Sequence, residues 1–107
     1  MAGQKELPRR YPRFDSPKGT LVAWQYGSKR TVSPLQNLGL GGLFIRTTES
    51  PPLGTFIQVL VDTPIGEIRA QAVVQNIRPN EGMGVKIVGM QQEHRARFAR
   101  WLSNLSS

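Results

Sequence analysis

Apolar and polar residues alternate along several short segments of this chain, which is the pattern of strands that bury one face. The longest of these segments runs from 67 to 78. Four of its apolar residues recur at every second position and are expected to share one face: Ile68, Ala70, Ala72 and Val74. Five further segments are predicted to be strands from their β-branched and aromatic residues: 20–26, 29–35, 43–48, 56–62 and 83–88.

Glycine, proline and asparagine interrupt these segments and predict the connections between them. Short turns are expected at 27–28 and 63–66, and a loop is expected at 15–19. The glycine-rich segment 37–42 is also predicted to be a loop. Pro34 is expected to end the strand before that loop or to place it at a sheet edge, because proline has no N–H to donate.

The period of the pattern changes near the end of the chain. Beyond Gln91, four large apolar residues recur at helical spacing: Phe98, Trp101, Leu102 and Leu105. We therefore predict one amphipathic helix of about three to four turns. Its arginines, Arg95, Arg97 and Arg100, are expected to form a solvated face.

Six strands at hairpin-like spacing followed by one helix predict an all-β fold with one C-terminal helix. The expected architecture is an antiparallel barrel or sandwich with the helix packed against it. The chain has 107 residues, which is the length of one domain. Residues 1–8 are expected to form a flexible N-terminal lead-in, and residues 9–105 the folded domain.

The composition offers little from which a catalytic site could be built. The chain has no cysteine and one histidine, His94, which excludes disulfides, thiolate chemistry and multi-histidine metal sites. Its seven carboxylates have no catalytic spacing, and no P-loop is present. We predict that the protein is not an enzyme and holds no metal or cofactor, with His94 on the surface or packed under the helix. Without a secretory signal or an apolar run of roughly 20 residues, a cytoplasmic protein with no membrane span is expected.

The charge of the chain narrows the choice of partner. Fourteen Lys and Arg residues against seven Asp and Glu give a formal net charge of +7. Such an excess favours polyanionic partners, namely nucleic acids, nucleotides or an acidic membrane surface, although it also serves solubility. The densest cationic cluster is Arg9-Arg10-Tyr11-Pro12-Arg13-Phe14, just ahead of the first predicted strand.

Two features of the sequence could together form a nucleotide site. The guanidinium groups of Arg9 and Arg13 can bind phosphate bidentately, address the O6/N7 edge of guanine, or stack on a base. The segment Asn37-x-Gly39-x-x-Gly42 offers approachable backbone N–H groups and a side-chain amide for a base edge. Taken alone, the arginines could be a solvated basic tail, and the glycines a plain turn between strands.

The order of these features resembles the PilZ domain family. Arg-x-x-x-Arg, then a strand pair, then Asp/Asn-x-Ser-x-x-Gly leading into a strand is the signature of that family. Residues 37–45 are similar to its second motif and the strand after it, and Gly82-Met-Gly-Val-Lys-Ile87 resembles its final strand. The resemblance covers roughly residues 8–105. It implies a six-stranded antiparallel β-barrel that binds cyclic di-GMP, commonly as an intercalated dimer of two ligand molecules.

The resemblance also implies roles for individual residues. Arg9 and Arg13 match the two motif arginines, which contact phosphates and guanine. Arg10, beside them, is expected to add a phosphate or stacking contact. Asn37 matches the position that reads a guanine edge, and Gly42 matches the closing glycine.

Two positions depart from the family pattern. Gly39 stands where the family has serine, so one hydroxyl is missing. The loss of one such hydrogen bond typically costs about 1 kcal/mol, which is a several-fold weakening of binding, while the backbone N–H of Gly39 remains for the ligand. The second departure is the absence of an aromatic residue near Gln75.

Three hypotheses on function follow. The first is a cyclic di-GMP receptor that changes its N-terminal surface on binding and so signals to a protein partner, whose identity stays open. The alternative is a degenerate PilZ-like adaptor that binds only proteins, with weak or no nucleotide binding. A barrel that binds single-stranded nucleic acid is disfavoured, because no clear aromatic pair lies on one predicted strand face.

Overall fold

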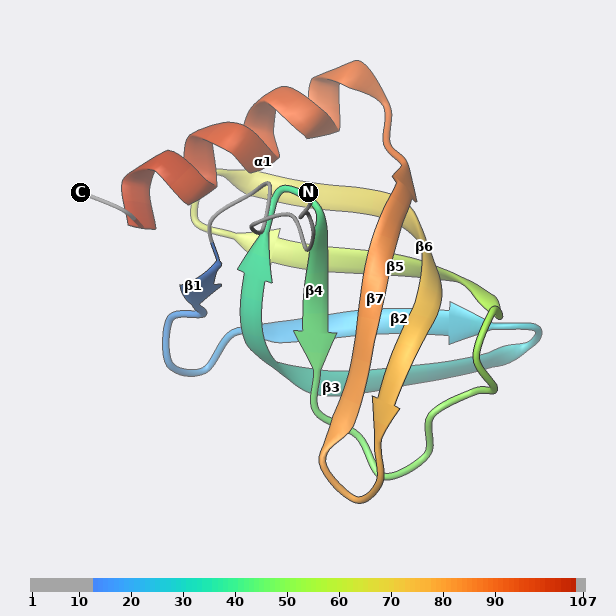
Figure 1. Ribbon diagram of the computed structural model, residues 1–107. Coiled ribbons are helices and arrows are strands. Elements are labelled where there is room, and N and C mark those ends of the chain that lie inside the picture. The colour runs from blue at the N-terminus through green and yellow to red at the C-terminus, as the bar shows by residue number, and fades with distance from the viewer. Residues whose placement is uncertain (1–12, 106–107) are drawn as a thin grey trace, which may run out of the picture.

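The alternating segments form seven strands, and the final helical segment forms one helix (Figure 1). The computed structural model describes residues 13–105. The strands are β1 (Phe14–Asp15), β2 (Leu21–Tyr26), β3 (Lys29–Gly39), β4 (Gly42–Ile45), β5 (Phe56–Thr63), β6 (Gly66–Arg78) and β7 (Gly82–Gly89). The helix, α1, spans Gln92–Leu105.

The long strands close into a barrel through antiparallel pairing alone. The sheet runs in the order β3-β2-β5-β6-β7-β4, and a pairing of β3 with β4 joins its two ends. The two-residue β1 adds to β3 as a seventh strand. The predicted all-β fold, a six-stranded antiparallel barrel with a C-terminal helix, is therefore confirmed.

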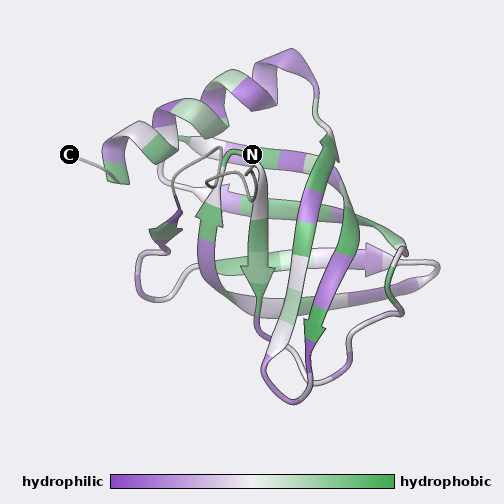
Figure 2. Ribbon diagram, in the orientation of Figure 1, coloured by the Kyte–Doolittle hydropathy of each residue, from purple (hydrophilic) through white to green (hydrophobic). Residues whose placement is uncertain are grey.

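The core consists of the apolar side chains that point from the strands into the barrel. Figure 2 shows how hydropathy alternates along the strands. The predicted inward face of β6 is confirmed, since all four of its apolar residues are buried: Ile68, Ala70, Ala72 and Val74. The core also contains one polar pair, in which Trp24 Nε1 donates to Ser33 Oγ at 3.0 Å. Because both partners are buried, this hydrogen bond removes the cost of an unsatisfied indole N–H.

The helix closes one end of the barrel and packs against β6 (Figure 1). Its predicted apolar face is confirmed, because Phe98, Trp101 and Leu102 are buried in the barrel core. Burial of each such side chain contributes about 1.5–3 kcal/mol to folding. Within residues 13–105, no helix has the length and apolar character needed to cross a membrane.

Polar contacts tie the first turns of α1 to the start of β6. The backbone N–H of Arg69 donates to His94 Nδ1 at 3.2 Å, so His94 has the helix-packing role that the sequence suggested. Arg97 donates to the carbonyl oxygen of Glu67 and pairs with Glu93 at 3.3 Å. The expectation of a wholly solvated basic face was therefore wrong for Arg97, which is half-buried against β6.

The prediction of a loop at 37–42 was also wrong. Strand β3 continues to Gly39 and β4 begins at Gly42, so only Leu40 and Gly41 form the turn. Pro34 does not end β3, because its carbonyl oxygen still accepts a hydrogen bond from the N–H of Arg46 at 3.0 Å. The predicted strand at 43–48 is instead β4, which starts one residue earlier and ends at Ile45.

Candidate ligand-binding site

The short strand β1 places Arg13 beside Asn37. Phe14 pairs with Leu38 and Asp15 pairs with Asn37, which fixes the chain next to the end of β3. Ser16 strengthens this attachment, since its backbone N–H donates to the carbonyl oxygen of Gln36 at 3.1 Å. As a result, Arg13 Nη2 donates to Asn37 Oδ1 at 2.5 Å, although the two residues are 24 positions apart in sequence.

A row of cross-strand neighbours extends from Asn37 over the outer surface of the barrel. Asn37 on β3 pairs with Phe44 on β4, Phe44 pairs with Gly84 on β7, and Gly84 pairs with Asn76 on β6. We call these four residues the outer row. The spacing between paired strands is about 4.8 Å, so the backbones of Asn37 and Asn76 stand about 14 Å apart with Phe44 and Gly84 between them.

Phe44 lies on the outer surface although it is almost fully covered. Its neighbours Leu43 and Ile45 belong to the barrel core, and Phe44 is outside that core, so its ring faces outward. The guanidinium of Arg78 on β6 lies over this ring, 5.3 Å from its centroid. This cation–π contact holds a positive charge above the middle of the outer row.

Two β-bulges turn the amides of the outer row toward solvent. The register of β3 shifts between Leu35 and Asn37, and that of β6 shifts between Val74 and Asn76. Leu35 and Val74 are buried, and a regular strand would place the residue two positions later on the same inward face. The extra residue reverses the alternation, so Asn37 and Asn76 lie on the outer face.

A shallow cleft of about 240 Å³ lies along the outer row. Its lining includes Arg13, Asn37, Phe44, Asn76, Arg78 and Gly84. Glycine at position 84 leaves room for the amide of Asn76, because a Cβ there would lie 2.7 Å from Asn76 Oδ1. The cleft therefore combines two guanidinium groups and two amides around an aromatic ring, which are groups suited to phosphate and base edges.

The residues predicted from the sequence have different places relative to this cleft. Arg9 and Arg10 lie outside the described residues. Gly39 and Gly42 pair with each other at the end of the β3–β4 hairpin. A Cβ on Gly42 would lie 2.3 Å from the carbonyl oxygen of Val85, so close packing of β4 on β7 by itself accounts for this glycine.

Phe44, Asn76, Arg78 and Gly84 were missed by the sequence reasoning. The signal available for Gly84 was the segment Gly82-Met-Gly, which was read only as a strand. Asn76 and Arg78 gave no readable signal, because the β6 bulge places them on a face that the period of two does not predict.

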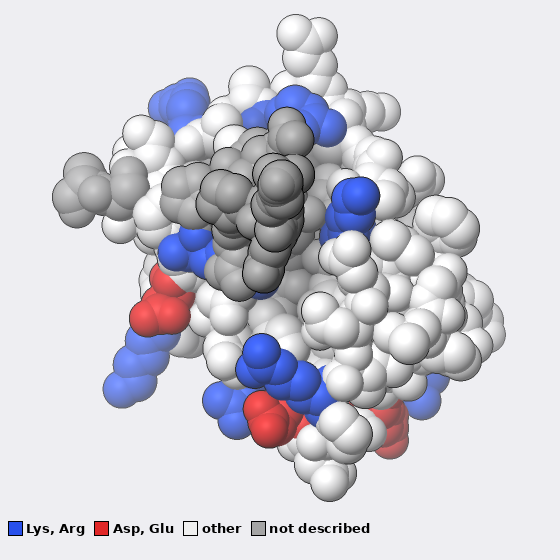
Figure 3. All heavy atoms as spheres, in the orientation of Figure 1, with Lys and Arg blue, Asp and Glu red and all other residues white. Residues whose placement is uncertain are grey.

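Basic side chains are dispersed over the face that Figure 3 shows, and several of them stand next to an acidic side chain. Among the described residues, Lys29 pairs with Glu49 at 3.3 Å and Arg69 pairs with Glu67 at 3.1 Å. On this face of the described residues, the positive charge therefore does not form the continuous track that would follow a nucleic acid backbone.

Several solved structures share this fold. The PilZ domain with c-di-GMP of YcgR from Escherichia coli aligns with a TM-score of 0.74 and 17% identity, over 94% of this chain and 92% of that one. The K. pneumonia MrkH–c-di-GMP complex aligns with a TM-score of 0.76 and 14% identity, over 94% and 52%. The Bacillus subtilis inhibitor of motility (MotI/DgrA) aligns with a TM-score of 0.72 and 19% identity, over 94% and 54%. The chain thus spans about half the length of the last two proteins.

Family membership rests on sequence as well as on shape. Among curated proteins, none matches the chain. The family model described as PilZ domain matches residues 8–104, which span β1 to β7 and nearly all of α1. This match covers most of the sequence and includes Arg13 and Asn37, the two residues that the fold brings into contact. The chain therefore belongs to the PilZ domain family.

Proposed function

We propose that this protein is a receptor module for cyclic di-GMP that binds its ligand along the outer row. The observation that carries the proposal is the contact of Arg13 with Asn37 at one end of the cleft. The solved structures of YcgR and MrkH, which share the fold, are complexes with c-di-GMP.

The hydrogen bond from Arg13 decides how Asn37 would meet a base. Because Oδ1 of Asn37 accepts from Arg13, the amide nitrogen Nδ2 is the group that remains for the ligand. Nδ2 can donate to the O6 and N7 acceptors of guanine, and the guanidinium of Arg13 can bind an adjacent phosphate. Arg9 and Arg10 would supply further phosphate or stacking contacts.

In this proposal the protein acts by binding and not by catalysis, in the bacterial cytoplasm. Two ligand molecules would bind as an intercalated dimer. Ligand contact with residues 9–13 would change the N-terminal surface that a protein partner meets, so the bound state could be distinguished from the free state.

Calorimetry of the whole chain against cyclic di-GMP tests the proposal. We expect micromolar or tighter binding and a stoichiometry of two ligands per chain. Arg13→Ala should weaken binding about ten- to hundredfold, because a hydrogen bond to a charged group contributes about 1.5–3 kcal/mol. Arg100→Ala is the matched control, since Arg100 is exposed on the helix and outside the cleft lining. The proposal would be overturned if a folded protein gave no heat of binding with cyclic di-GMP, or if Arg13→Ala and Arg100→Ala changed the affinity equally.

Gly39 favours a second candidate, an adaptor with weak or no nucleotide binding. Gly39 is buried within β3. By the resemblance to the family motif, it matches the position of the serine. In Gly39→Ser, a receptor should bind cyclic di-GMP several-fold more tightly, because a hydroxyl donor and acceptor is restored. If neither the native chain nor Gly39→Ser binds the ligand, the adaptor is the better description.

A further inference from the structure

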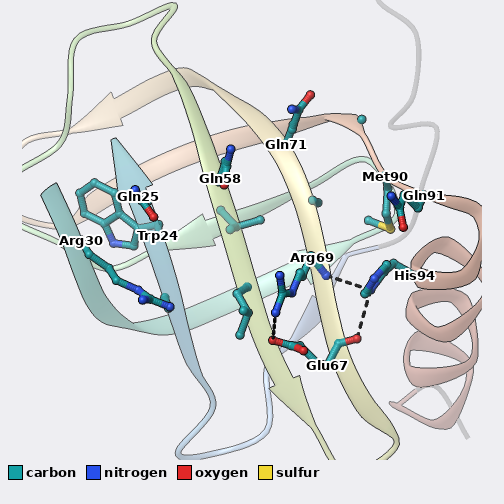
Figure 4. Close-up of a pocket in the computed structure, with 15 residues that line it drawn as sticks. Trp24, Gln25, Arg30, Gln58, Glu67, Arg69, Gln71, Met90, Gln91 and His94 are labelled. Atoms are coloured by element: carbon teal, nitrogen blue, oxygen red, sulfur yellow. Dashed lines mark hydrogen bonds and ion pairs between the residues drawn. The ribbon is translucent and has the colours of Figure 1, made fainter. Parts of the chain in front are cut away.

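A second and larger concavity, of about 840 Å³, lies on another part of the barrel wall (Figure 4). It covers the outer face of β2, β5 and the first half of β6, beside the start of α1. Ala23 and Leu60, which pair across β2 and β5, form part of its lining. Both are half-buried, so the floor of this groove is apolar.

Three glutamines form a continuous row next to that floor. Gln25 on β2 pairs with Gln58 on β5, and Gln58 pairs with Gln71 on β6. Figure 4 shows these side chains on three successive strands. We call Gln25, Gln58, Gln71, Ala23 and Leu60 together the glutamine wall. All five side chains are uncharged, although the three glutamines are exposed.

Among the described residues that line this concavity, the charged ones stand at the edges of the glutamine wall, and they are Arg30, Glu67 and Arg69. Arg30 pairs with Gln25 at one side, and Arg69 pairs with Leu60 at the other. Arg69 also forms an exposed ion pair with Glu67 at 3.1 Å. Val32, which pairs with Ala23, extends the apolar floor and is 61% exposed.

This arrangement has the composition that is typical of protein interfaces. Charged residues are depleted at the centre of such interfaces, arginine is enriched in them relative to the rest of the surface, and the rim is polar. An uncharged amide can be buried against a partner at a lower desolvation cost than a Lys or Glu at the same position. An apolar floor with an exposed Val32 beside it is the kind of surface that a partner covers.

We infer that the glutamine wall binds an acidic, amphipathic segment of a partner protein. The inference rests on the proposed function, since a receptor without catalysis needs a partner that reads its state. Apolar side chains of the segment would contact Ala23 and Leu60, its polar groups would meet the glutamine amides, and its carboxylates would approach Arg30 and Arg69. The net charge of +7 steers an acidic segment toward the protein. The groove is concave, and a protruding segment fits it better than the same concave wall of a second copy.

Strand β6 connects this wall to the ligand cleft but keeps the two separate. Gln71 lies on the wall side of the β6 bulge, and Asn76 lies on the cleft side. A change in either surface can therefore be made without altering the residues of the other. This separation allows the partner site and the nucleotide site to be tested independently.

Selection from a random-peptide phage library on the whole chain tests the inference. We expect enrichment of peptides that combine Asp or Glu with Leu, Ile, Val or Phe. The best of these peptides should bind about tenfold more weakly to Gln58→Glu, which places a carboxylate at the centre of the wall. Gln36→Glu is the matched control, since Gln36 is exposed on β3 away from the wall, and its effect should stay within about twofold.

Four results would overturn the inference: no enrichment, enrichment of basic or purely apolar peptides, equal binding to both variants, or self-association of the chain that Gln58→Glu abolishes in sedimentation. The variant Asn37→Ala tests the partner site and the nucleotide site separately. It should lower the affinity for cyclic di-GMP and leave peptide binding unchanged. A chain that binds peptide but not cyclic di-GMP would refute only the proposed function. A chain that binds cyclic di-GMP but no acidic peptide would refute only the partner site.

Discussion

Gly42 lies where β4 passes close to β7, and alanine at this position tests whether the glycine serves the barrel or the ligand. A Cβ on residue 42 would lie 2.3 Å from the carbonyl oxygen of Val85 and 3.4 Å from its carbonyl carbon. Both atoms belong to the backbone, so no change of rotamer can relieve the contact. The β4–β7 pairing would have to widen by about 1 Å to restore an ordinary carbon–oxygen distance.

The cost of that widening follows from the pairings that it disturbs. Lys86 is the register partner of Gly42, and the same pair of strands carries the contact of Phe44 with Gly84. Overpacking of a well-packed region costs about 1–3 kcal/mol, and we expect the upper end because no side chain can yield. For a domain of this size, 1 kcal/mol corresponds to about 4–8 °C in Tm, so Gly42→Ala should lower Tm by about 10–20 °C.

Urea unfolding followed by tryptophan fluorescence measures this effect. The midpoint should fall while the m-value stays constant, which identifies a change in stability and not in the unfolded state. Gly89→Ala is the matched control on β7, because a Cβ there would lie 3.2 Å from the flexible end of Gln71, and its effect should stay within about 0.5 kcal/mol. If Gly42→Ala kept native stability but lost affinity for cyclic di-GMP, the structural explanation of Gly42 would be refuted.

Three further substitutions test other parts of the structure. Gly84→Ala should displace only the amide of Asn76. Calorimetry should therefore show several-fold weaker binding of cyclic di-GMP, while the free energy of unfolding changes by less than about 1 kcal/mol. A loss of stability without a loss of affinity would contradict this. Arg78→Ala removes the cation–π contact over the outer row and should also weaken binding several-fold, with less than about 1 kcal/mol lost in urea unfolding. Ser33→Ala leaves the buried indole N–H of Trp24 without its acceptor and should cost about 1–3 kcal/mol, and an unchanged urea midpoint would speak against that hydrogen bond.

The parts of the fold that the sequence predicted are those in which one rule of periodicity holds without interruption. The inward face of β6 up to Val74 and the buried face of α1 both follow from regular spacing, because spacing determines which side chains meet the core. The extension of β3 to Gly39 could not be predicted in this way. It depends on the pairing of the end of β3 with β4, Leu38 with Leu43 and Gly39 with Gly42, which local sequence does not report.

The candidate site lies where the regular alternation of inward and outward residues along a strand is interrupted. Asn37 was identified through a family motif, whereas Asn76 was missed, although the two residues stand in the same relation to their strands. Each follows a buried residue by two positions and is turned outward by a bulge, and a bulge has no clear signature in a single sequence. Without the two bulges both amides would point into the apolar core, where an unsatisfied amide is costly. The same two irregularities therefore protect the core and build the polar ends of the cleft, so removal of either bulge should damage stability and ligand binding together.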